Sequence, residues 1–120
     1  MIDGLEARLD ELAARGHVTT YGELSRDLKL TGPGCIARLT TALEELMEID
    51  TTAQAPLRAA LVVGRASGGL PARGFFEKAQ ALGHNTSDPV VFHRTHMDAC
   101  FARAIGAKAR HVHSHSRDPH

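Results

Sequence analysis

Apolar residues recur three and four positions apart in five stretches of the chain, a spacing typical of amphipathic helices. The first stretch has a single apolar stripe between charged residues, formed by Ile2, Leu5, Leu9 and Leu12. In the central stretch the predicted buried stripe is formed by Ile36, Leu39, Leu43, Leu46 and Met47. The predicted helices cover residues 2–15, 20–28, 35–47, 74–82 and 88–105.

Start and stop signals support these helices. Thr20 followed three residues later by Glu23 is a capping box, in which each side chain satisfies a backbone donor at the helix start. The sequence Gly32-Pro33-Gly34 then breaks the chain before the central helix. Asp88 followed by Pro89 is a typical start for the last helix. The short helix, the break and the central helix together predict a helix-turn-helix.

Residues 57–63 are the best candidate for a β-strand, because their continuous apolar end indicates burial on both faces. A Gly-rich turn follows at 64–69, and Leu70-Pro71 is a candidate return strand, which Pro71 restricts to an edge position. This arrangement predicts a wing-like hairpin. The predicted fold is therefore α+β and mostly helical, a winged helix-turn-helix with a small β-hairpin and two extra C-terminal helices.

The chain of 120 residues is short enough for one domain, which we place at 1–106, with the last helix ending at Gly106. Residues 107–120 are polar and rich in histidine without periodicity, and we expect a disordered tail. Two cysteines, an acidic amphipathic N-terminus and the lack of a long apolar run favour a cytoplasmic protein with no membrane association.

The net charge of zero hides an asymmetry between the two halves of the chain. Residues 1–50 carry ten acidic and five basic side chains, whereas residues 51–120 carry four acidic and nine basic ones. The central helix lies in the acidic half, which argues against simple DNA binding, since phosphate contacts supply most of the affinity of DNA-binding domains. The alternative is that the two halves attract each other, within one chain or across a dimer.

Candidate chemical groups are few. His93, His96 and Cys100 recur on roughly one helical face and are candidate zinc ligands, but their spacing is nonstandard and favours partly buried polar residues at an interface. The alternating histidines of 111–115 favour a solvated tail over a metal site. Cys35, at a helix start, has no partner histidine fixed by a motif, and residues 64–74 lack the phosphate-binding Gly patterns. We therefore predict no catalytic residue, metal, cofactor or small-molecule substrate.

One stretch is similar to a known family. The sequence Thr20-Tyr21-Gly22-Glu23-Leu24-Ser25, the Gly-Pro-Gly turn, a helix, and Leu61-Val62-Val63 with its Gly-rich continuation resemble the C-terminal DNA-binding domain of the alkylguanine DNA alkyltransferases and alkyltransferase-like proteins. The resemblance covers about residues 17–76. It implies a winged-helix fold and DNA as a partner.

The family's reactive residues are absent at the matching positions. The family motif Pro-Cys-His-Arg corresponds to Arg58-Ala59-Ala60-Leu61, so Ala59 replaces the alkyl-accepting cysteine and Ala60 replaces the histidine that activates it. The arginine that replaces a flipped base corresponds to Ala37, one position from Arg38. The resemblance therefore does not extend to alkyl transfer, and we predict that the protein is not an enzyme.

Two functions remain open from the sequence. The first is nucleic-acid binding through the central helix and the basic wing, for which the predicted contact residues are Tyr21, Lys29, Arg38, Thr41, Arg65 and Arg73. The second is a protein-interaction or dimerisation module, possible as a homodimer, that keeps the fold without binding DNA. The acidic half favours the second function, whereas the basic wing favours the first.

Overall fold

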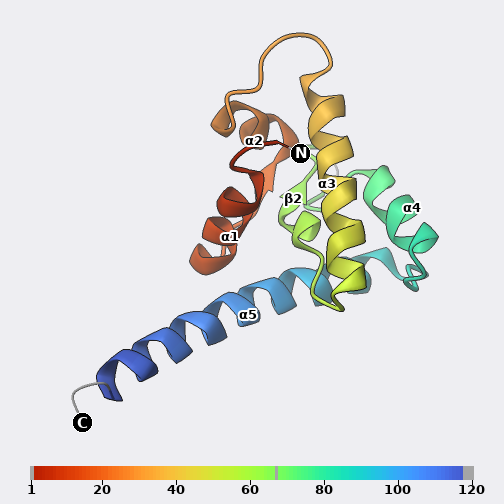
Figure 1. The fold of residues 1–120 in the computed structure, drawn as a ribbon. Coiled ribbons are helices and arrows are strands. Elements are labelled where there is room, and N and C mark those ends of the chain that lie inside the picture. Colours follow the sequence, from red (N-terminus) through yellow and green to blue (C-terminus); the bar gives the residue numbers. More distant parts are fainter. Residues whose placement is uncertain (1, 67, 118–120) are drawn as a thin grey trace.

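The computed structural model describes residues 2–66 and 68–117 of the chain, and their side chains as far as Gly106. It is mostly helical, with a small two-stranded sheet (Figure 1). The α-helices are α1 (Leu5–Arg15), α2 (Tyr21–Asp27), α3 (Cys35–Thr52), α4 (Arg73–Ala81) and α5 (Pro89–Arg117). The strands are β1 (Thr19–Thr20) and β2 (Val62–Val63), and a 3₁₀ helix, η1 (Arg58–Leu61), precedes β2. No helix in the described ranges is long and apolar enough to cross a membrane.

The predicted hairpin is wrong. Residues 58–61 form the 3₁₀ turn η1 instead of a strand, and β2 pairs in parallel with β1, with Thr19 opposite Val62 and Thr20 opposite Val63. Leu70 and Pro71 are not in a strand, although the Gly64 N–H donates to the Leu70 carbonyl oxygen at 2.8 Å. The apolar run 59–63 is buried as predicted, but burial alone does not distinguish a 3₁₀ turn from a strand.

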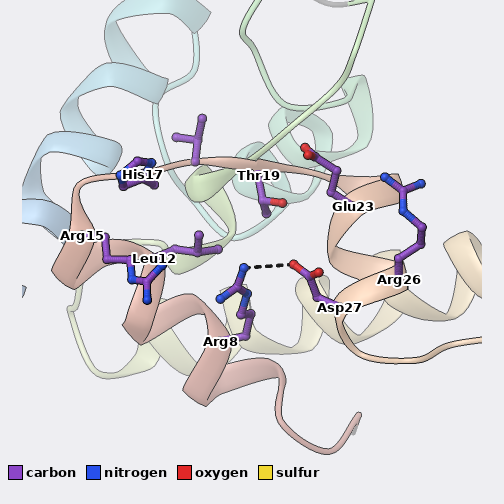
Figure 2. Close-up of a pocket in the computed structure, with 9 residues that line it drawn as sticks. Arg8, Leu12, Arg15, His17, Thr19, Glu23, Arg26 and Asp27 are labelled. Atoms are coloured by element: carbon purple, nitrogen blue, oxygen red, sulfur yellow. Dashed lines mark hydrogen bonds and ion pairs between the residues drawn. The ribbon is translucent and has the colours of Figure 1, made fainter.

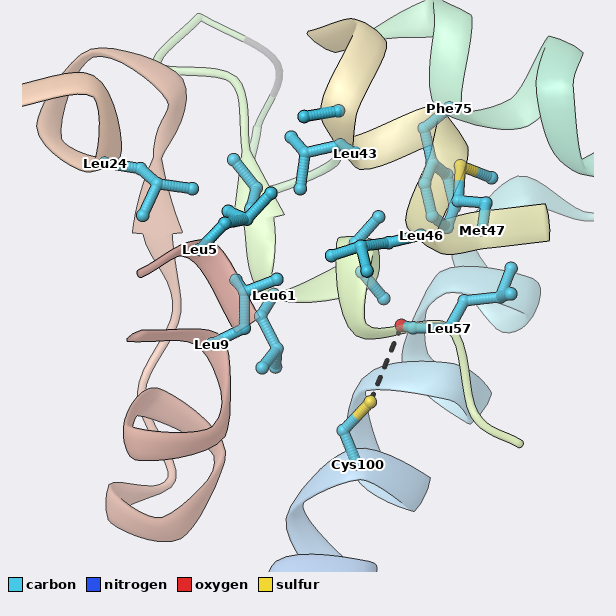
Figure 3. Packing of buried hydrophobic residues seen from close by; sticks show 14 of the residues in the cluster. Leu5, Leu9, Leu24, Leu43, Leu46, Met47, Leu57, Leu61, Phe75 and Cys100 are labelled. Atoms are coloured by element: carbon cyan, nitrogen blue, oxygen red, sulfur yellow. Dashed lines mark hydrogen bonds between the residues drawn. The ribbon is translucent and has the colours of Figure 1, made fainter. Parts of the chain in front are cut away.

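The core lies between α1, α3 and the η1–β2 segment. Figure 3 shows leucines from these elements, with Leu24 of α2 and Phe75 of α4, converging on one cluster. The fully buried large side chains are Leu5, Leu9, Leu24, Leu39, Leu46, Met47, Leu57, Leu61 and Val62. One predicted core residue is wrong: Ile36 is 43% exposed, because the first turn of α3 precedes the part of the helix that enters the core at Leu39.

The last helix begins as predicted but does not end at Gly106. The Asp88 carboxylate accepts a hydrogen bond from the Val91 N–H at 3.2 Å, and the helix then continues through Gly106 to Arg117. A glycine inside a helix costs about 1 kcal/mol relative to alanine, so it weakens a helix without necessarily ending it. The segment expected to be an irregular tail is thus helical to Arg117, and 118–120 lie outside the described residues.

The predicted apolar side of α5 is buried in part. The sequence places Val90, Arg94, Met97, Phe101 and either Ala104 or Ile105 along one side of this helix. Met97, Phe101 and Ala104 pack against the core, whereas Val90 and Ile105 are exposed. The helix also presents His93 and Cys100 to the interior, where it packs against α1 and η1. Polar groups of α5 thereby reach the core, where they form hydrogen bonds with the backbone around η1.

Candidate nucleic-acid interface

The cap of α2 is formed by its predicted residues. The Thr20 hydroxyl oxygen accepts a hydrogen bond from the Glu23 N–H at 3.2 Å, and the hydroxyl donates to the Glu23 carboxylate at 3.0 Å. The carboxylate thus meets the Thr20 side chain, where the capping-box prediction has it meeting the Thr20 backbone. Either way, the start of α2 is fixed directly after β1.

The turn between α2 and α3 leaves the start of α3 open to solvent. Gly34 precedes the helix with a left-handed φ of 78°, and no side chain caps the helix there. The first turn of α3 contains no acidic residue. The first N–H groups of a helix lack intrahelical acceptors and carry a partial positive charge, so an uncapped start attracts anions.

Two predicted contact residues lie on this open end of α3. The Arg38 side chain is exposed and reaches back over the turn, where its Nη2 donates to the Thr31 carbonyl oxygen at 2.9 Å. Thr41 lies one turn further along, and both residues line a shallow hollow of about 370 Å³ on this helix. Glu45 lines the same hollow, so the basic part of the face is limited to the helix start.

The predicted wing loop, residues 64–72, lies beside the start of α2 even though it forms no hairpin. The β1–β2 register places Val63 opposite Thr20, so the loop leaves the core next to α2. The Tyr21 hydroxyl oxygen accepts a hydrogen bond from the Ala72 N–H at 3.0 Å, which ties the other end of the loop to the same helix. Burial raises the pKa of the half-buried Tyr21 phenol. Tyr21 therefore acts as a tether for the loop that carries Arg65.

The remaining predicted residues divide into free and paired side chains. Lys29 is exposed in the turn, where its backbone has a left-handed φ of 58°. Arg65 is exposed in the 64–72 loop. Arg73 is 90% exposed at the start of α4, and its Nε pairs with the Glu77 carboxylate at 3.1 Å. The structure thus brings Arg38 and Thr41 together on one hollow, whereas Lys29 lines a separate hollow and Arg73 is paired on its own helix.

Ion pairs sort the basic residues of the described chain into two groups. The residues that pair with carboxylates are Arg8, Arg15, Arg58, Arg73 and Lys78. Among described side chains, no ion pair forms at Arg26, Lys29, Arg38, Arg65, Arg94 or Arg103. Three of these six belong to α2, the turn and α3. Arg26 is not among the predicted contact residues, because Glu23 and Asp27 lie close to it in the sequence.

A second pocket, between α1 and α2, contains the ion pair that Asp27 forms with Arg8. In Figure 2 the Arg8 side chain extends from α1 towards Asp27 of α2, and its Nη2 lies 3.0 Å from the carboxylate. Arg8 also pairs with Glu11, and this hydrogen bond is the main reason that the pKa of Arg8 is raised. The pocket, about 350 Å³ in volume, is therefore lined by charges that largely compensate one another. Asp27 also lines a shallow hollow that contains Lys29 of the turn, with Asp3 and Glu11 beside it.

The face of α5 that contains His93, His96 and Cys100 is bound to the backbone around η1. The His93 Nε2 lies 2.9 Å from the Ala60 carbonyl oxygen, and the Leu57 N–H donates to His96 Nδ1 at 3.0 Å. Cys100 Sγ donates to the Leu57 carbonyl oxygen at 3.5 Å (Figure 3). These contacts confirm the interpretation of the three residues as polar groups at an interface. Within the described chain, no three His, Cys, Asp or Glu groups lie close enough to hold a metal.

The same contacts argue against nucleophilic chemistry at this interface. Burial raises the pKa of the Cys100 thiol to about 12, so the sulfur stays protonated and acts as a donor. Burial, with a smaller effect of His84, lowers the pKa of His96, which agrees with a neutral ring that accepts from Leu57. Ala59 and Ala60, at the positions of the family's reactive cysteine and histidine, are buried and have no reactive side-chain atom.

A buried ion pair anchors η1 to the end of α3. The Asp50 carboxylate is 3% exposed and accepts hydrogen bonds from the Arg58 guanidinium, with Nη2 at 2.9 Å, and from the Arg58 N–H at 3.0 Å. Arg58 Nη1 also donates to Glu6 of α1 at 3.0 Å. One arginine thereby joins α1, α3 and η1. Sequence reasoning missed this pair, because Glu48, Thr51 and Thr52 surround Asp50 in sequence and nothing there distinguishes the buried carboxylate from the exposed one.

Comparisons with protein-family models, with curated proteins and with solved structures found no match to the chain.

Proposed function

We propose that this chain is a non-enzymatic nucleic-acid-binding protein of winged-helix type that contacts its ligand through the start of α3 and the 64–72 loop. The observation that carries the proposal is the grouping of uncommitted positive charge. Lys29, in the turn before α3, and Arg38, in the uncapped first turn of α3, form no ion pair among described side chains. An exposed helix start with free cations around it is well suited to phosphate.

Each group has a separate task in this proposal. The N–H groups at the start of α3 and the Lys29 ammonium bind backbone phosphates, which positions the protein without reading sequence. Arg38 leaves its bond to the Thr31 carbonyl and binds a phosphate or a guanine edge. Thr41 meets a base or sugar, and Arg65 adds a phosphate contact from the loop that Tyr21 holds in place.

The resemblance to the alkyltransferase DNA-binding domains supports the same surface. The Thr20–Ser25 sequence, the Gly-Pro-Gly turn and the following helix, which carry the resemblance, include the site proposed here. Alkyl transfer is no part of the proposal, because Ala59 and Ala60 replace the reactive pair.

A direct test is fluorescence anisotropy with a labelled mixed-sequence DNA duplex across a range of salt concentrations. We expect Arg38→Ala and Lys29→Ala each to weaken binding and to reduce the slope of log affinity against log salt by about one, as loss of one phosphate contact does. Arg94→Ala is the matched control, because Arg94 is an exposed arginine on α5, remote in sequence from the site. No salt-sensitive binding at low salt, or an equal loss in the control, would overturn the proposal.

A protein-interaction module is the second candidate, favoured by the acidic surface on the middle of α3. Glu45 is exposed there and lines the same hollow as Arg38 and Thr41. Like charges repel phosphate, so this part of α3 is better suited to a basic protein partner. Glu45→Gln separates the two candidates: it should strengthen DNA binding if α3 approaches phosphate, and leave the anisotropy unchanged if it does not.

A further inference from the structure

A mostly apolar pocket of about 540 Å³ lies between α1, the end of α3 and α5, away from the proposed nucleic-acid interface. Its walls are largely small residues, so space remains where larger side chains would have filled it. The apolar lining residues are Ala13, Ile49, Ala53, Ala55, Pro56 and Ala104. Ile49 is 47% exposed and lines this pocket together with the small residues, so the pocket has an apolar rim.

Two charges of opposite sign lie on facing sides of this pocket. Asp10, on α1, has a side chain that is 67% exposed, and its only ion pair among described residues is the 4.0 Å contact with Arg58. Arg103, on α5, is exposed and forms no ion pair with the described side chains. The buried charges of the pocket, Asp50 and Arg58, satisfy each other. Only the charges of Asp10 and Arg103 are thus available to an incoming molecule.

The helix that forms one wall leaves the body of the protein at this place. Cys100, Arg103 and Ala104 line the pocket, and α5 then continues to Arg117, extending past α1 (Figure 1). A lone helical segment of about a dozen residues is only marginally stable in water, so packing against another surface would stabilise it. Residues 107–117 contain three basic residues and no acidic one, whereas α1 contains three acidic and two basic residues.

We propose that this pocket is half of a two-fold symmetric interface between two copies of the chain. A two-fold axis in the contact plane, passing between α1 and α5, places Asp10 of each copy opposite Arg103 of the other. The two Ile49 side chains then enter the joined pockets, and the extended end of each α5 approaches the acidic α1 of the other copy. The charges on the two sides of the pocket make the surface complementary to itself, which is the requirement for such a dimer.

The oligomeric state tests this interface independently of nucleic-acid binding. Sedimentation velocity of the full chain over a concentration series should show a reversible dimer. Ile49→Asp should raise the dissociation constant about a hundredfold or abolish the dimer, because it places a carboxylate in the apolar contact. Val91→Asp is the matched control, an exposed valine that lines a different hollow on α5, and should dimerise like the parent. Circular dichroism and urea unfolding verify that both variants are folded.

Charge exchange provides the sharper test. Asp10→Arg and Arg103→Glu alone should each weaken the dimer about tenfold or more, since each turns two symmetry-related attractions into repulsions. The double variant Asp10→Arg/Arg103→Glu should recover the affinity of the parent within about threefold, because the pairs are restored with reversed sign. A monomer at every concentration overturns the proposal, as does a dimer that Ile49→Asp leaves intact or a double variant no tighter than the singles. A monomer would leave the pocket to a small apolar ligand.

Discussion

The charged side chains at the two ends of α3 differ in burial and in their partners. At the first turn, the Arg38 side chain is exposed and hydrogen-bonds only the Thr31 carbonyl oxygen, in the connection that precedes α3. At the last turns, Asp50 is 3% exposed and held by the guanidinium and the N–H of Arg58. The first charge is available to a ligand, whereas the second is entirely occupied by the protein.

Under the proposed function, the first turn of α3 contacts the ligand and the last turns hold the scaffold. A buried carboxylate with a bidentate arginine has little freedom to rearrange, so it fixes the position of the helix end. An exposed arginine on an uncapped helix start makes a small contribution to stability and retains its charge for a ligand. We therefore expect substitutions at the two ends of α3 to affect different measurements, stability at Asp50 and affinity at Arg38.

The largest effect is expected at Asp50. Asp50→Ala leaves the Arg58 charge partly buried without its main partner, and breaking a buried pair in this way costs about 3–5 kcal/mol. Urea unfolding followed by circular dichroism measures this loss as a lower free energy of unfolding.

Glu6→Ala is the matched control for Asp50→Ala, because Glu6 bonds the same guanidinium from the exposed side. We expect it to lower the free energy of unfolding by less than about 1 kcal/mol. Equal losses for the two variants would show that burial of Asp50 does not determine the strength of the anchor.

The second prediction concerns pH and the α5 contact with Leu57. His96 Nδ1 accepts the Leu57 N–H, so a protonated ring offers no acceptor and leaves that N–H unpaired, at about 1–3 kcal/mol. Burial and the neighbouring His84 lower the pKa of His96 in the folded protein, while Asp50 opposes them. Because the unfolded chain takes up this proton first, stability is complete above about pH 6.5 and is lost as the pH falls through the lowered folded value.

His96→Asn provides the measurement for the pH prediction. An asparagine oxygen can accept at the place of Nδ1 without titrating, so the free energy of unfolding should fall less steeply between pH 7 and pH 5 than in the parent. His17→Asn replaces an exposed histidine outside this contact and should keep the pH dependence of the parent. Identical slopes for the parent and His96→Asn would contradict the assignment of His96 as an acceptor.

The sequence predicts those parts of the fold that depend on contacts between near neighbours along the chain. The Thr20 cap, the Gly-Pro-Gly turn and the start of α5 at Asp88 depend on neighbours within a few residues, and the structure confirms them. The η1 turn depends on bonds to His93 and His96, which are more than thirty residues away in sequence. A pattern of apolar residues contains no information on such bonds, and residues 57–63 therefore read as a strand.

The candidate site shows the same limit. Lys29, Arg38 and Arg65 were predicted from their charge and their place near the turn, and their freedom from ion pairs depends on partners that the sequence does not specify. Arg73 pairs with Glu77, four residues further along α4, and the predicted helix 74–82 begins one residue too late to include this pair. Ile36 matched the apolar period of α3 but lies before the helix reaches the core.

The third prediction tests the local cap of α2. Thr20→Ala removes the hydroxyl that accepts from the Glu23 N–H, and loss of an N-cap of this kind costs about 1 kcal/mol. Thr20→Ser keeps the acceptor and should stay within a few tenths of a kcal/mol of the parent. If thermal or urea unfolding gives the same value for both variants, the β1 pairing rather than the cap fixes the start of α2.

The smallest effect is expected at Gly22, inside α2. Its backbone is outside the left-handed region, and an added Cβ would lie 3.8 Å from the flexible Arg26 Nη1, an ordinary contact. Gly22→Ala should therefore raise the free energy of unfolding by about 0.5 kcal/mol, mainly by restricting the unfolded chain. Gly34→Ala is the opposing control, since its φ of 78° strains any L side chain and should lower stability by about 1 kcal/mol or more. Changes of the same sign would mean that local backbone preference does not govern the helix-turn-helix, and that its ends, like η1, are set by distant contacts.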